Sequence, residues 1–490
     1  MVFNSLSFLI FFPTVVLVYY LIPCRVRYLW LLFASWFFYM SWNISYGLLL
    51  LFSTATAYFG ALLLSRAKNS GSGKRILIIS LLAEFCPLVF FKYTGFILDS
   101  INHVFEVAGS YAPFALPDIL LPIGISFYTF QAAGYIIDVY RGTVEAERNF
   151  FRFALFVAFF PQLVAGPIER TKNLLSQLDC TARFDFEKAR DGLYLMLWGY
   201  IMKVVIADRI AIFVNCVYES PLKYGGVYLI TAAMLFSIQI YCDFAGYSTI
   251  AKGAAKILGI NLMDNFNSPT LSISVSEYWR RWHISLTSWF RDYLYISLGG
   301  NRKGPKRKLL NKFVVFTISG LWHGADWTYV MWGSLNGIFI ILEDIASSAL
   351  GRIPAFPGSK HLKLPIKLIK WLLTCILVDI AYIFFRAVNM GSAFLIIESI
   401  LKTSNWKELT NGGIFSCGLD VKNFVFLLIM IAMLMLVDLF NNKGIRLRTL
   451  LAGKPLPLRS LLTAAAAVFI LLFGIWGSTY DAAEFIYFQF

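Results

Sequence analysis

The sequence predicts an all-α, polytopic integral membrane protein, built as one membrane domain over residues 1–490. Of these 490 residues, 58% are hydrophobic and only 14% are charged, whereas a soluble domain typically carries about 25% charged residues. Apolar runs close to the length that crosses a bilayer, about 20 residues, recur along the chain. These two observations exclude a series of water-soluble domains, a disordered chain and a disulfide-bonded scaffold.

The apolar runs predict about ten to thirteen transmembrane or re-entrant segments. The run at 313–345 is long enough for two passes, and we expect it to break near Gly324. The runs lie at 5–22, 28–42, 46–64, 75–91, 119–137, 151–165, 192–215, 225–242, 313–345, 364–389, 422–440 and 459–478.

Basic residues in the loops predict the orientation, because loops rich in Lys and Arg stay on the cytoplasmic side. Arg25 and Arg27 follow the first run and no basic residue precedes it, which predicts an external N-terminus. Segments with basic and no acidic residues are expected inside: 66–75, 301–312, 352–370 and 443–459. Segments without a basic excess are expected outside: 93–118, 403–421 and 477–490, which makes the C-terminal tail at 479–490 external.

The same loops account for the net charge of +15, so we expect no nucleic-acid partner. The seven Cys residues are scattered without a C-x-x-C pair, and only four His residues occur. This pattern predicts neither a disulfide framework nor a metal site.

Polar residues inside apolar stretches are candidates for function. The segment 277–298 predicts an amphipathic helix at the cytoplasmic interface, with its aromatic residues and His283 on one face. His323 lies within LWHGADW at 321–327, in the middle of a long apolar stretch. For both imidazoles two interpretations stay open: a packed side chain, or a functional group such as a general base.

Asp243 interrupts another apolar run. It can orient a His, line a polar cavity, or pair with Lys252 or another basic residue. Gly and Pro at 122–128 and 159–170, the latter including Gln162, predict broken helices around a cavity or a pair of helix ends.

Together these stretches resemble the membrane-bound O-acyltransferase family, and most of all its bacterial branch similar to alginate O-acetyltransferases. The matching pieces run in the family's order across nearly the whole chain. They are LPIGISFYTFQAAGYIIDVYRG (121–142), FFPQLVAGPIER (159–170), KVVIADR (203–209), YCDFAGYSTIAKG (241–253), NFNSP (265–269), EYWRRWHISLTSWFRDYLYISLGGNRKG (277–304), LWHGADWTYVMWG (321–333) and FIYFQF (485–490).

The resemblance implies an all-helical funnel around a central catalytic His, which in this chain is His323. His283 is then the second family histidine, and the cavity's supporting residues are Asp243, Trp322 and Gln162. FIYFQF resembles a terminal motif of bacterial surface-glycan acyl transfer, which implies that Tyr487 carries the acyl group as an ester. A phenol, with a pKa of about 10, is a better leaving group than a sugar hydroxyl. The same composition also fits an aromatic belt.

The implied reaction moves an acetyl group from cytoplasmic acetyl-CoA towards an extracytoplasmic polysaccharide, with no permanently bound cofactor. The phosphorylated donor is expected near Arg280, Arg281 and the basic loops. Implied partners are membrane lipid, the polysaccharide and a periplasmic transferase of SGNH-hydrolase type, in the bacterial inner membrane. The alternatives are D-alanyl or other acyl transfer to a cell-wall polymer by the same fold, a non-enzymatic transporter, and a scaffold protein.

Overall fold

The computed structural model describes residues 1–67, 69–180, 182–350, 363–403, 405–476 and 486, and these residues form helices without a strand. The all-α class predicted from the sequence is confirmed. The chain divides into two compact units: an N-terminal unit, Met1–Met196 with Tyr247–Met263, and a C-terminal unit, Leu197–Gly246 with Asp264–Phe490. That both units work as a single membrane domain stays a prediction.

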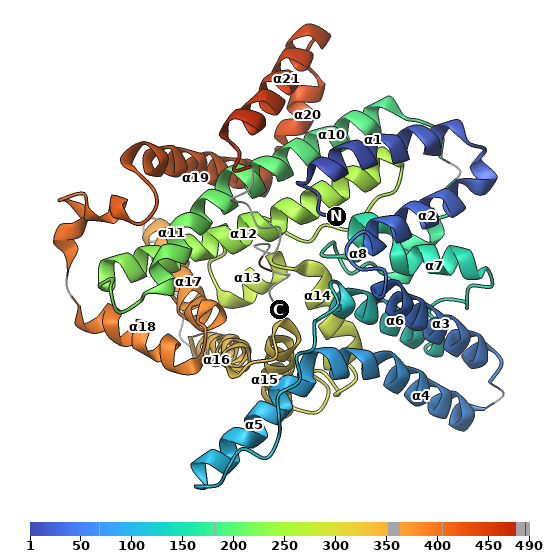
Figure 1. Cartoon of the computed structure of the whole chain (residues 1–490), viewed down its shortest axis with the longest axis horizontal. Coiled ribbons are helices and arrows are strands. Elements are labelled where there is room, and N and C mark those ends of the chain that lie inside the picture. The colour runs from blue at the N-terminus through green and yellow to red at the C-terminus, as the bar shows by residue number, and fades with distance from the viewer. Residues whose placement is uncertain (68, 181, 351–362, 404, 477–485, 487–490) are drawn as a thin grey trace. The chain divides into compact units, whose positions relative to one another are not determined.

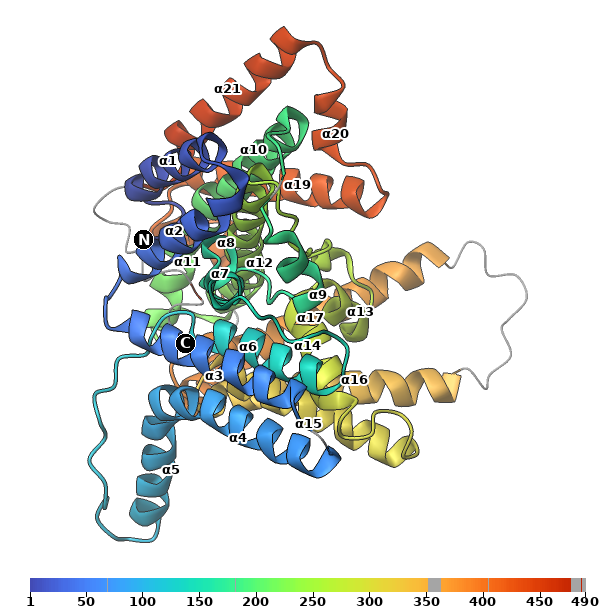
Figure 2. The same ribbon diagram turned by 90° about the vertical axis from the view of Figure 1, so that its right-hand side faces the viewer.

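In the N-terminal unit, α3, α4 and α6 lie side by side, and α2 packs on α7 (Figures 1 and 2). The elements are α1 (Leu6–Leu21), η1 (Cys24–Val26), α2 (Arg27–Met40), α3 (Tyr46–Ser65), α4 (Ser70–Leu88), η2 (Val89–Tyr93), α5 (Thr94–Val107), α6 (Ile125–Tyr140), α7 (Phe150–Ala158), α8 (Phe160–Leu163), α9 (Thr171–Leu174), η3 (Leu175–Gln177) and α10 (Phe186–Tyr200), whose last turn belongs to the other unit.

In the C-terminal unit, α15 packs along α16, and α16 packs on α17 (Figure 1). The elements are η4 (Ile201–Ala207), α11 (Asp208–Glu219), α12 (Gly226–Ile257, which passes into the other unit after Gly246), η5 (Pro269–Leu271), α13 (Val275–Arg281), α14 (Ile284–Trp289), η6 (Phe290–Tyr295), α15 (Pro305–His323), α16 (Trp327–Leu350), α17 (Lys363–Arg386), α18 (Met390–Lys402), η7 (Trp406–Leu409), η8 (Gly413–Ser416), α19 (Val421–Asn442), α20 (Leu447–Ala452) and α21 (Leu456–Phe473).

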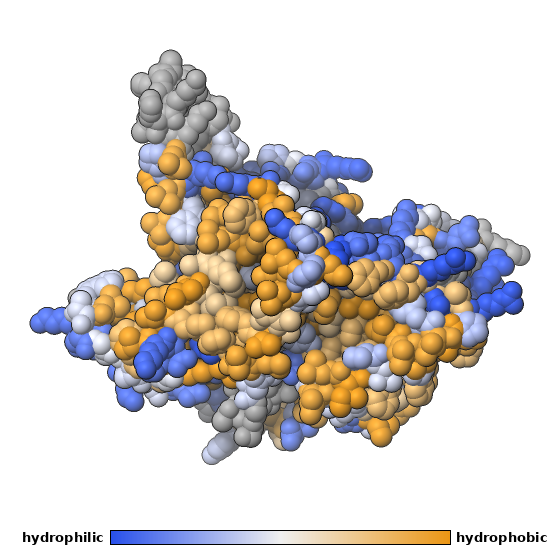
Figure 3. All heavy atoms as spheres, turned by 90° about the horizontal axis from the view of Figure 1, so that it is seen from above, coloured by the Kyte–Doolittle hydropathy of each residue, from blue (hydrophilic) through white to orange (hydrophobic). Residues whose placement is uncertain are grey.

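Seven helical segments of the described chain are long and apolar enough to cross a membrane: Tyr46–Ser65, Ser70–Val107, Gly226–Ile257, Trp327–Ala349, Leu364–Arg386, Val421–Asn442 and Leu456–Phe473. Large hydrophobic side chains are exposed on them, such as Ile429 on α19 and Leu472 on α21. Figure 3 shows hydrophobic residues over broad areas of the face that it presents. Such areas are unfavourable in water and natural in lipid, so the chain is a multi-pass membrane protein.

Two of the predicted apolar runs form short helices inside the N-terminal unit. The run at 119–137 becomes α6, whose residues 125–136 are all buried, and the run at 151–165 becomes α7 and α8. Their hydrophobic side chains face protein, so apolar composition alone does not distinguish them from helices that face lipid. The total number of membrane crossings stays a prediction.

The break expected near Gly324 is present, because α15 ends at His323 and α16 begins at Trp327. The prediction of one continuous helix over 277–298 is wrong. Helix α13 ends at Arg281 and α14 begins at Ile284, with His283 between them in the left-handed region at φ +41°. The physical reason is a distant segment that accepts the next two N–H groups: Ile284 N–H donates to the Asn265 carbonyl and Ser285 N–H to the Asn265 side chain.

Glycine allows α15 and α16 to approach closely just before this break. A Cβ atom at Gly320 would lie 2.2 Å from the Tyr329 carbonyl oxygen of α16, and one at Gly333 would lie 2.3 Å from the Phe316 carbonyl oxygen of α15. The two helices therefore touch backbone to backbone, which fixes the direction in which His323 leaves α15.

We predict that Gly320→Ala lowers the free energy of unfolding by about 1–3 kcal/mol, because the added methyl group must push α16 away. Thermal unfolding in detergent measures this loss. Gly95→Ala is the matched control, since nothing lies within 4 Å of a Cβ at Gly95 in α5 and alanine favours helix. Equal unfolding temperatures for the two variants would contradict the close approach.

Candidate active site

His323 is the last residue of α15 and is almost completely buried, at 3% exposure. Aromatic rings surround its imidazole edge to face: the ring centroids of Trp322 and Trp332 both lie 4.9 Å away, and that of Phe385 lies 5.8 Å away. These rings come from α15, α16 and α17. The helices thus enclose the imidazole in a largely aromatic shell.

His283 is fully buried, and the segment around Asn265 holds its ring. Asn265 Oδ1 accepts hydrogen bonds from the Ser285 N–H (3.2 Å) and the Ser285 hydroxyl (2.9 Å), and it lies 3.1 Å from His283 Nδ1. Because the Ser285 N–H can only donate, the shared atom is the amide oxygen, and His283 Nδ1 therefore carries the proton. The Nε2 nitrogen is left with its lone pair, which can accept a proton or a hydrogen bond.

Burial lowers the pKa of His283 from its ordinary value of 6.5 to about 3. The imidazole is therefore neutral across the physiological range. A neutral ring suits proton acceptance and the binding of an uncharged reacting group.

The two imidazoles lie together in one aromatic environment. Their ring centroids are 6.4 Å apart, and the Trp322 ring contacts both, at 4.9 Å from His323 and 6.1 Å from His283. The sequence placed these histidines 40 positions apart, and the C-terminal unit brings them side by side. Two imidazoles at this separation can serve one reacting group, one as base and the other as hydrogen-bond partner.

A second layer of hydrogen bonds holds the aromatic shell. The Trp279 indole N–H donates to Asn336 Oδ1 at 3.0 Å, and the Asn336 amide donates to the Trp332 carbonyl at 2.8 Å. The Tyr278 and Tyr382 hydroxyls are 2.8 Å apart. Helices α13, α16 and α17 are thereby linked around the site, which limits the movement of the rings that touch His323.

A cavity of about 210 Å³ lies beside this shell and shares one wall with it. Its lining includes Phe385, whose ring packs on His323, together with Tyr329, Asp326, Arg386 and Ile486. Arg386 donates to Asn215 at 2.8 Å, and among the described residues no carboxylate oxygen lies within 4.0 Å of its guanidinium. The cavity thus combines aromatic walls with charged groups, as small-molecule sites do.

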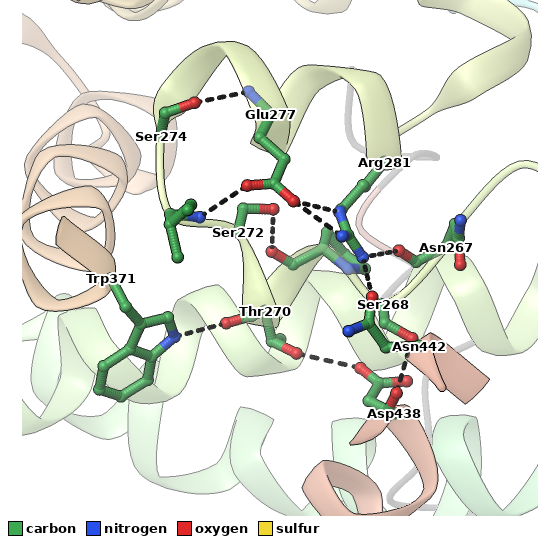
Figure 4. A network of polar contacts seen from close by, with 12 residues as sticks. Asn267, Ser268, Thr270, Ser272, Ser274, Glu277, Arg281, Trp371, Asp438 and Asn442 are labelled. Carbon is green, nitrogen blue, oxygen red and sulfur yellow. Dashed lines mark hydrogen bonds and ion pairs between the residues drawn. The ribbon is translucent and has the colours of Figure 1, made fainter. Parts of the chain in front are cut away.

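Arg280 and Arg281, the two arginines expected to bind the acyl donor, differ in their surroundings. Arg281 donates from Nε and Nη2 to Glu277 Oε1, at 3.0 and 2.7 Å, and from Nη1 to Asn442 at 2.8 Å (Figure 4). These bonds tie α13 to α19, so an anion at Arg281 must compete with Glu277. Arg280 is exposed, and its guanidinium is the more accessible of the two.

Figure 4 also shows how the loop before α13 is held. Asp438 of α19 accepts from the Thr270 hydroxyl at 3.0 Å, and the Trp371 indole N–H of α17 donates to the Thr270 carbonyl at 2.8 Å. Two separate helices therefore fix the segment that carries Asn265 and, through it, His283.

Asp243 contacts neither histidine. It forms a buried ion pair in which Lys203 Nζ lies 2.6 Å from its Oδ1, and its Oδ2 accepts the Ile486 N–H at 2.9 Å. Of the three alternatives that the sequence left open, the structure shows pairing with a basic residue, which is Lys203. Gln162 belongs to the N-terminal unit, where its amide donates to Gln131 (3.1 Å) and to the Phe156 carbonyl (3.0 Å). Tyr487 lies outside the described residues.

Three residues of the site were missed by sequence reasoning: Asn265, Trp332 and Phe385. Asn265 lies in the NFNSP segment (265–269). The feature that could have identified it is a polar side chain in a short loop to which the sequence analysis assigned no role. Trp332 and Phe385 lie in apolar runs, where an aromatic residue at the site has the same sequence pattern as one facing lipid.

Comparisons with known proteins show which family the chain resembles. A family model described as MBOAT, membrane-bound O-acyltransferase family, matches residues 146–385, which include both histidines. The chain is 39% identical over 450 residues to a probable alginate O-acetylase of Pseudomonas aeruginosa, covering 90% of this chain and 83% of that protein. It is 33% identical over 399 residues to a peptidoglycan O-acetyltransferase of Helicobacter pylori, covering 76% and 73%. It is 28% identical over 235 residues to a teichoic acid D-alanyltransferase of Streptococcus thermophilus, covering 45% and 56%.

The buried His283 predicts a pH-dependent loss of stability. Below pH 6.5 the unfolded chain binds a proton that the folded chain, with its pKa of about 3, does not bind. Lowering the pH therefore favours unfolding, and this site contributes roughly 1.5 kcal/mol of loss between pH 6.5 and 5.0.

Thermal unfolding at the two pH values measures this effect. His283→Gln should show a pH dependence smaller by that amount. His103→Gln, at an exposed position of α5, should keep the dependence of the parent protein. An unchanged dependence in His283→Gln would mean that this imidazole is not held neutral by burial.

Proposed function

Because the chain belongs to the membrane-bound O-acyltransferase family, we propose that it transfers an acetyl group from cytoplasmic acetyl-CoA to an extracytoplasmic polysaccharide, with His323 as the general base. The chain is a multi-pass membrane acyltransferase of the O-acetyltransferase type. The observation that carries the proposed role of His323 is its position: a buried imidazole at a helix break, 6.4 Å from a second neutral imidazole.

Transfer of an acetyl group from a thioester to a hydroxyl group needs one base and a site that is shielded from water. An acceptor hydroxyl oxygen attacks the acetyl carbonyl carbon, the new carbon–oxygen bond forms, and the carbon–sulfur bond to CoA breaks. Neutral His323 takes the hydroxyl proton and returns it to the departing thiolate. His283, whose Nδ1 proton is bound to Asn265, offers Nε2 to the same reacting groups. Its contribution is to position them by hydrogen bonding.

The donor side is supported by exposed basic residues. Acetyl-CoA carries phosphate groups, and guanidinium and ammonium groups bind phosphate well. Exposed Arg280 precedes the site on α13. Arg302 and Lys303 are exposed in the loop before α15, and Lys306 and Arg307 are exposed in its first turn. Lys308 and Lys312 contribute less, because both pair with Asp344, at 2.9 and 2.6 Å. By the positive-inside rule this loop is cytoplasmic, in a bacterial inner membrane with both termini outside.

The acceptor side is supported by the cavity that shares Phe385 with the histidine. Since the Phe385 ring packs on His323 and also lines the cavity, movement of this one side chain connects the cavity to the imidazole. Ile486, the residue before Tyr487, lines the same cavity. In our proposal the Tyr487 phenol is the first acceptor, and the acetyl ester is then passed to a polysaccharide through a periplasmic transferase of SGNH-hydrolase type.

An acetyl group is favoured over a D-alanyl group by the extent of the similarity. Relatives named as O-acetyl-transferring enzymes match 76–90% of this chain, whereas the D-alanyltransferase of Streptococcus thermophilus matches 45% of it at lower identity. Incubating the purified protein with acetyl-labelled CoA, and in parallel with a D-alanyl-loaded carrier protein, distinguishes the two. Labelling by the D-alanyl donor alone would overturn the acetyl assignment.

We predict that His323→Gln lowers acetyl transfer from labelled acetyl-CoA by about 10²–10⁴-fold, the usual contribution of a general base. Expression and unfolding temperature should stay close to those of the parent, because glutamine fills similar space. His103→Gln should transfer at the parental rate. Parental transfer by His323→Gln at equal expression would remove the proposed role of this residue.

We predict that intact-mass spectrometry of rapidly quenched turnover detects one acetyl group on the protein, located on Tyr487. Tyr487→Phe should lack the adduct, because it keeps the aromatic ring and loses the hydroxyl. A parent protein that turns over acetyl-CoA through His323 without this adduct would contradict the carrier role while leaving the base assignment intact.

A further inference from the structure

A buried charge cluster in the C-terminal unit has no part in the mechanism above. Lys203 Nζ lies 2.8 Å from Asp208 Oδ1 and 2.6 Å from Asp243 Oδ1, and each of the three residues is at most 6% exposed. The residues come from η4, the start of α11 and α12. Burying such a cluster of charges costs free energy, so its geometry and its other contacts call for a physical explanation.

The local structure explains how the cluster forms. Lys203 and Asp208 are five positions apart across the π-helical turn η4, in which hydrogen bonds join residues i and i+5. Helix α12 reaches this turn because Gly246 has no side chain: a Cβ there would lie 2.9 Å from the Gly199 carbonyl oxygen and 3.1 Å from the Lys203 nitrogen. One turn earlier on α12, Asp243 therefore meets the Lys203 ammonium group.

The second oxygen of Asp243 reaches a segment far away in the chain. Oδ2 accepts the backbone N–H of Ile486 at 2.9 Å, across 243 positions of sequence. Ile486 is itself 5% exposed and lines the cavity that shares Phe385 with His323. A charge-assisted hydrogen bond to a buried N–H is stronger than a neutral one, so Asp243 is an effective anchor for residue 486.

We propose that Asp243 is a positioning residue: fixed by Lys203, it holds residue 486 at the cavity wall so that the hydroxyl of Tyr487 reaches the acyl group at His323. This inference rests on the proposed carrier role of Tyr487. Tyr487 is the residue that directly follows Ile486 in the sequence. A misplacement of about 1 Å can cost about 100-fold in rate, which makes such an anchor worthwhile.

The cluster offers a matched pair of variants, Asp243→Asn and Asp208→Asn. Each removes one carboxylate charge from Lys203 and leaves the ammonium group paired with the other aspartate. Only Asp243→Asn changes the partner of Ile486, because an asparagine cannot offer one oxygen to Lys203 and another to the Ile486 N–H. A role limited to stabilising the fold would therefore affect both variants, whereas an anchor is lost in one.

The experiment has three readouts on the full-length protein. Hydrogen exchange of a C-terminal peptide containing Ile486 reports the anchor without needing activity. The rate of acetyl labelling at Tyr487 reports its consequence. Transfer of acetyl from acetyl-CoA to dissolved 4-methylphenol, an untethered phenol, reports whether the His323 site itself is intact.

We expect Asp243→Asn to exchange faster at the C-terminal peptide and to label Tyr487 roughly 10–100-fold more slowly, while 4-methylphenol is acetylated at the parental rate. Asp208→Asn should match the parent in exchange and labelling. Equal losses in both variants, parental labelling in Asp243→Asn, or loss of 4-methylphenol acetylation in Asp243→Asn would each overturn the positioning role. If the parent protein itself shows no Tyr487 adduct, the carrier role fails and the positioning role with it, a result distinct from a parent that labels and variants that do not differ.

Discussion

The break in the backbone between α15 and α16 is the constraint on which the rest of the site depends. A helix that ends inside an apolar environment leaves carbonyl groups and a polar side chain without water, and such an end is tolerated only where protein covers it. Here the cover consists of Trp332 on α16 and Phe385 on α17, which pack against His323 edge to face. Glycines at 320 and 333 allow α16 to approach α15 closely enough for Trp332 to cover the helix end.

The same constraint explains why the second histidine interrupts a helix. His283 takes a left-handed backbone conformation that costs free energy for a residue with a side chain. Asn265 compensates by accepting the neighbouring N–H groups with both its carbonyl and its side-chain oxygen. The result is an imidazole of fixed tautomer beside His323. The strained backbone at His283 is thus maintained by hydrogen bonds that the next two N–H groups donate to Asn265, 18 residues earlier in the chain.

The fold was predictable from the sequence wherever local pattern decides it. Long apolar runs became helices, and Gly324 marked the break after His323, because apolar length and a flexible residue act locally. The prediction of a continuous helix over 277–298 was wrong because hydrogen bonds from the Ile284 and Ser285 N–H groups to Asn265 prevail over helical periodicity. The pairing of Arg281 with Glu277 was not predicted either. An arginine that binds the acyl donor and an arginine that pairs within the protein have the same sequence pattern. Asp243 was ambiguous because its partners, Lys203 and Ile486, are distant in sequence.

The central claim, that His323 is the base for acyl transfer, is tested most directly by a structure determined with acetonyl-CoA, in which a methylene group is inserted between the sulfur and the carbonyl carbon of the thioester. The account predicts that the ketone carbon lies about 5–6 Å from a His323 ring nitrogen, leaving room for one bridging hydroxyl within reach of both. It also predicts that the Phe385 ring has moved aside. A ketone held away from His323, with the imidazole still enclosed by aromatic rings, would contradict it.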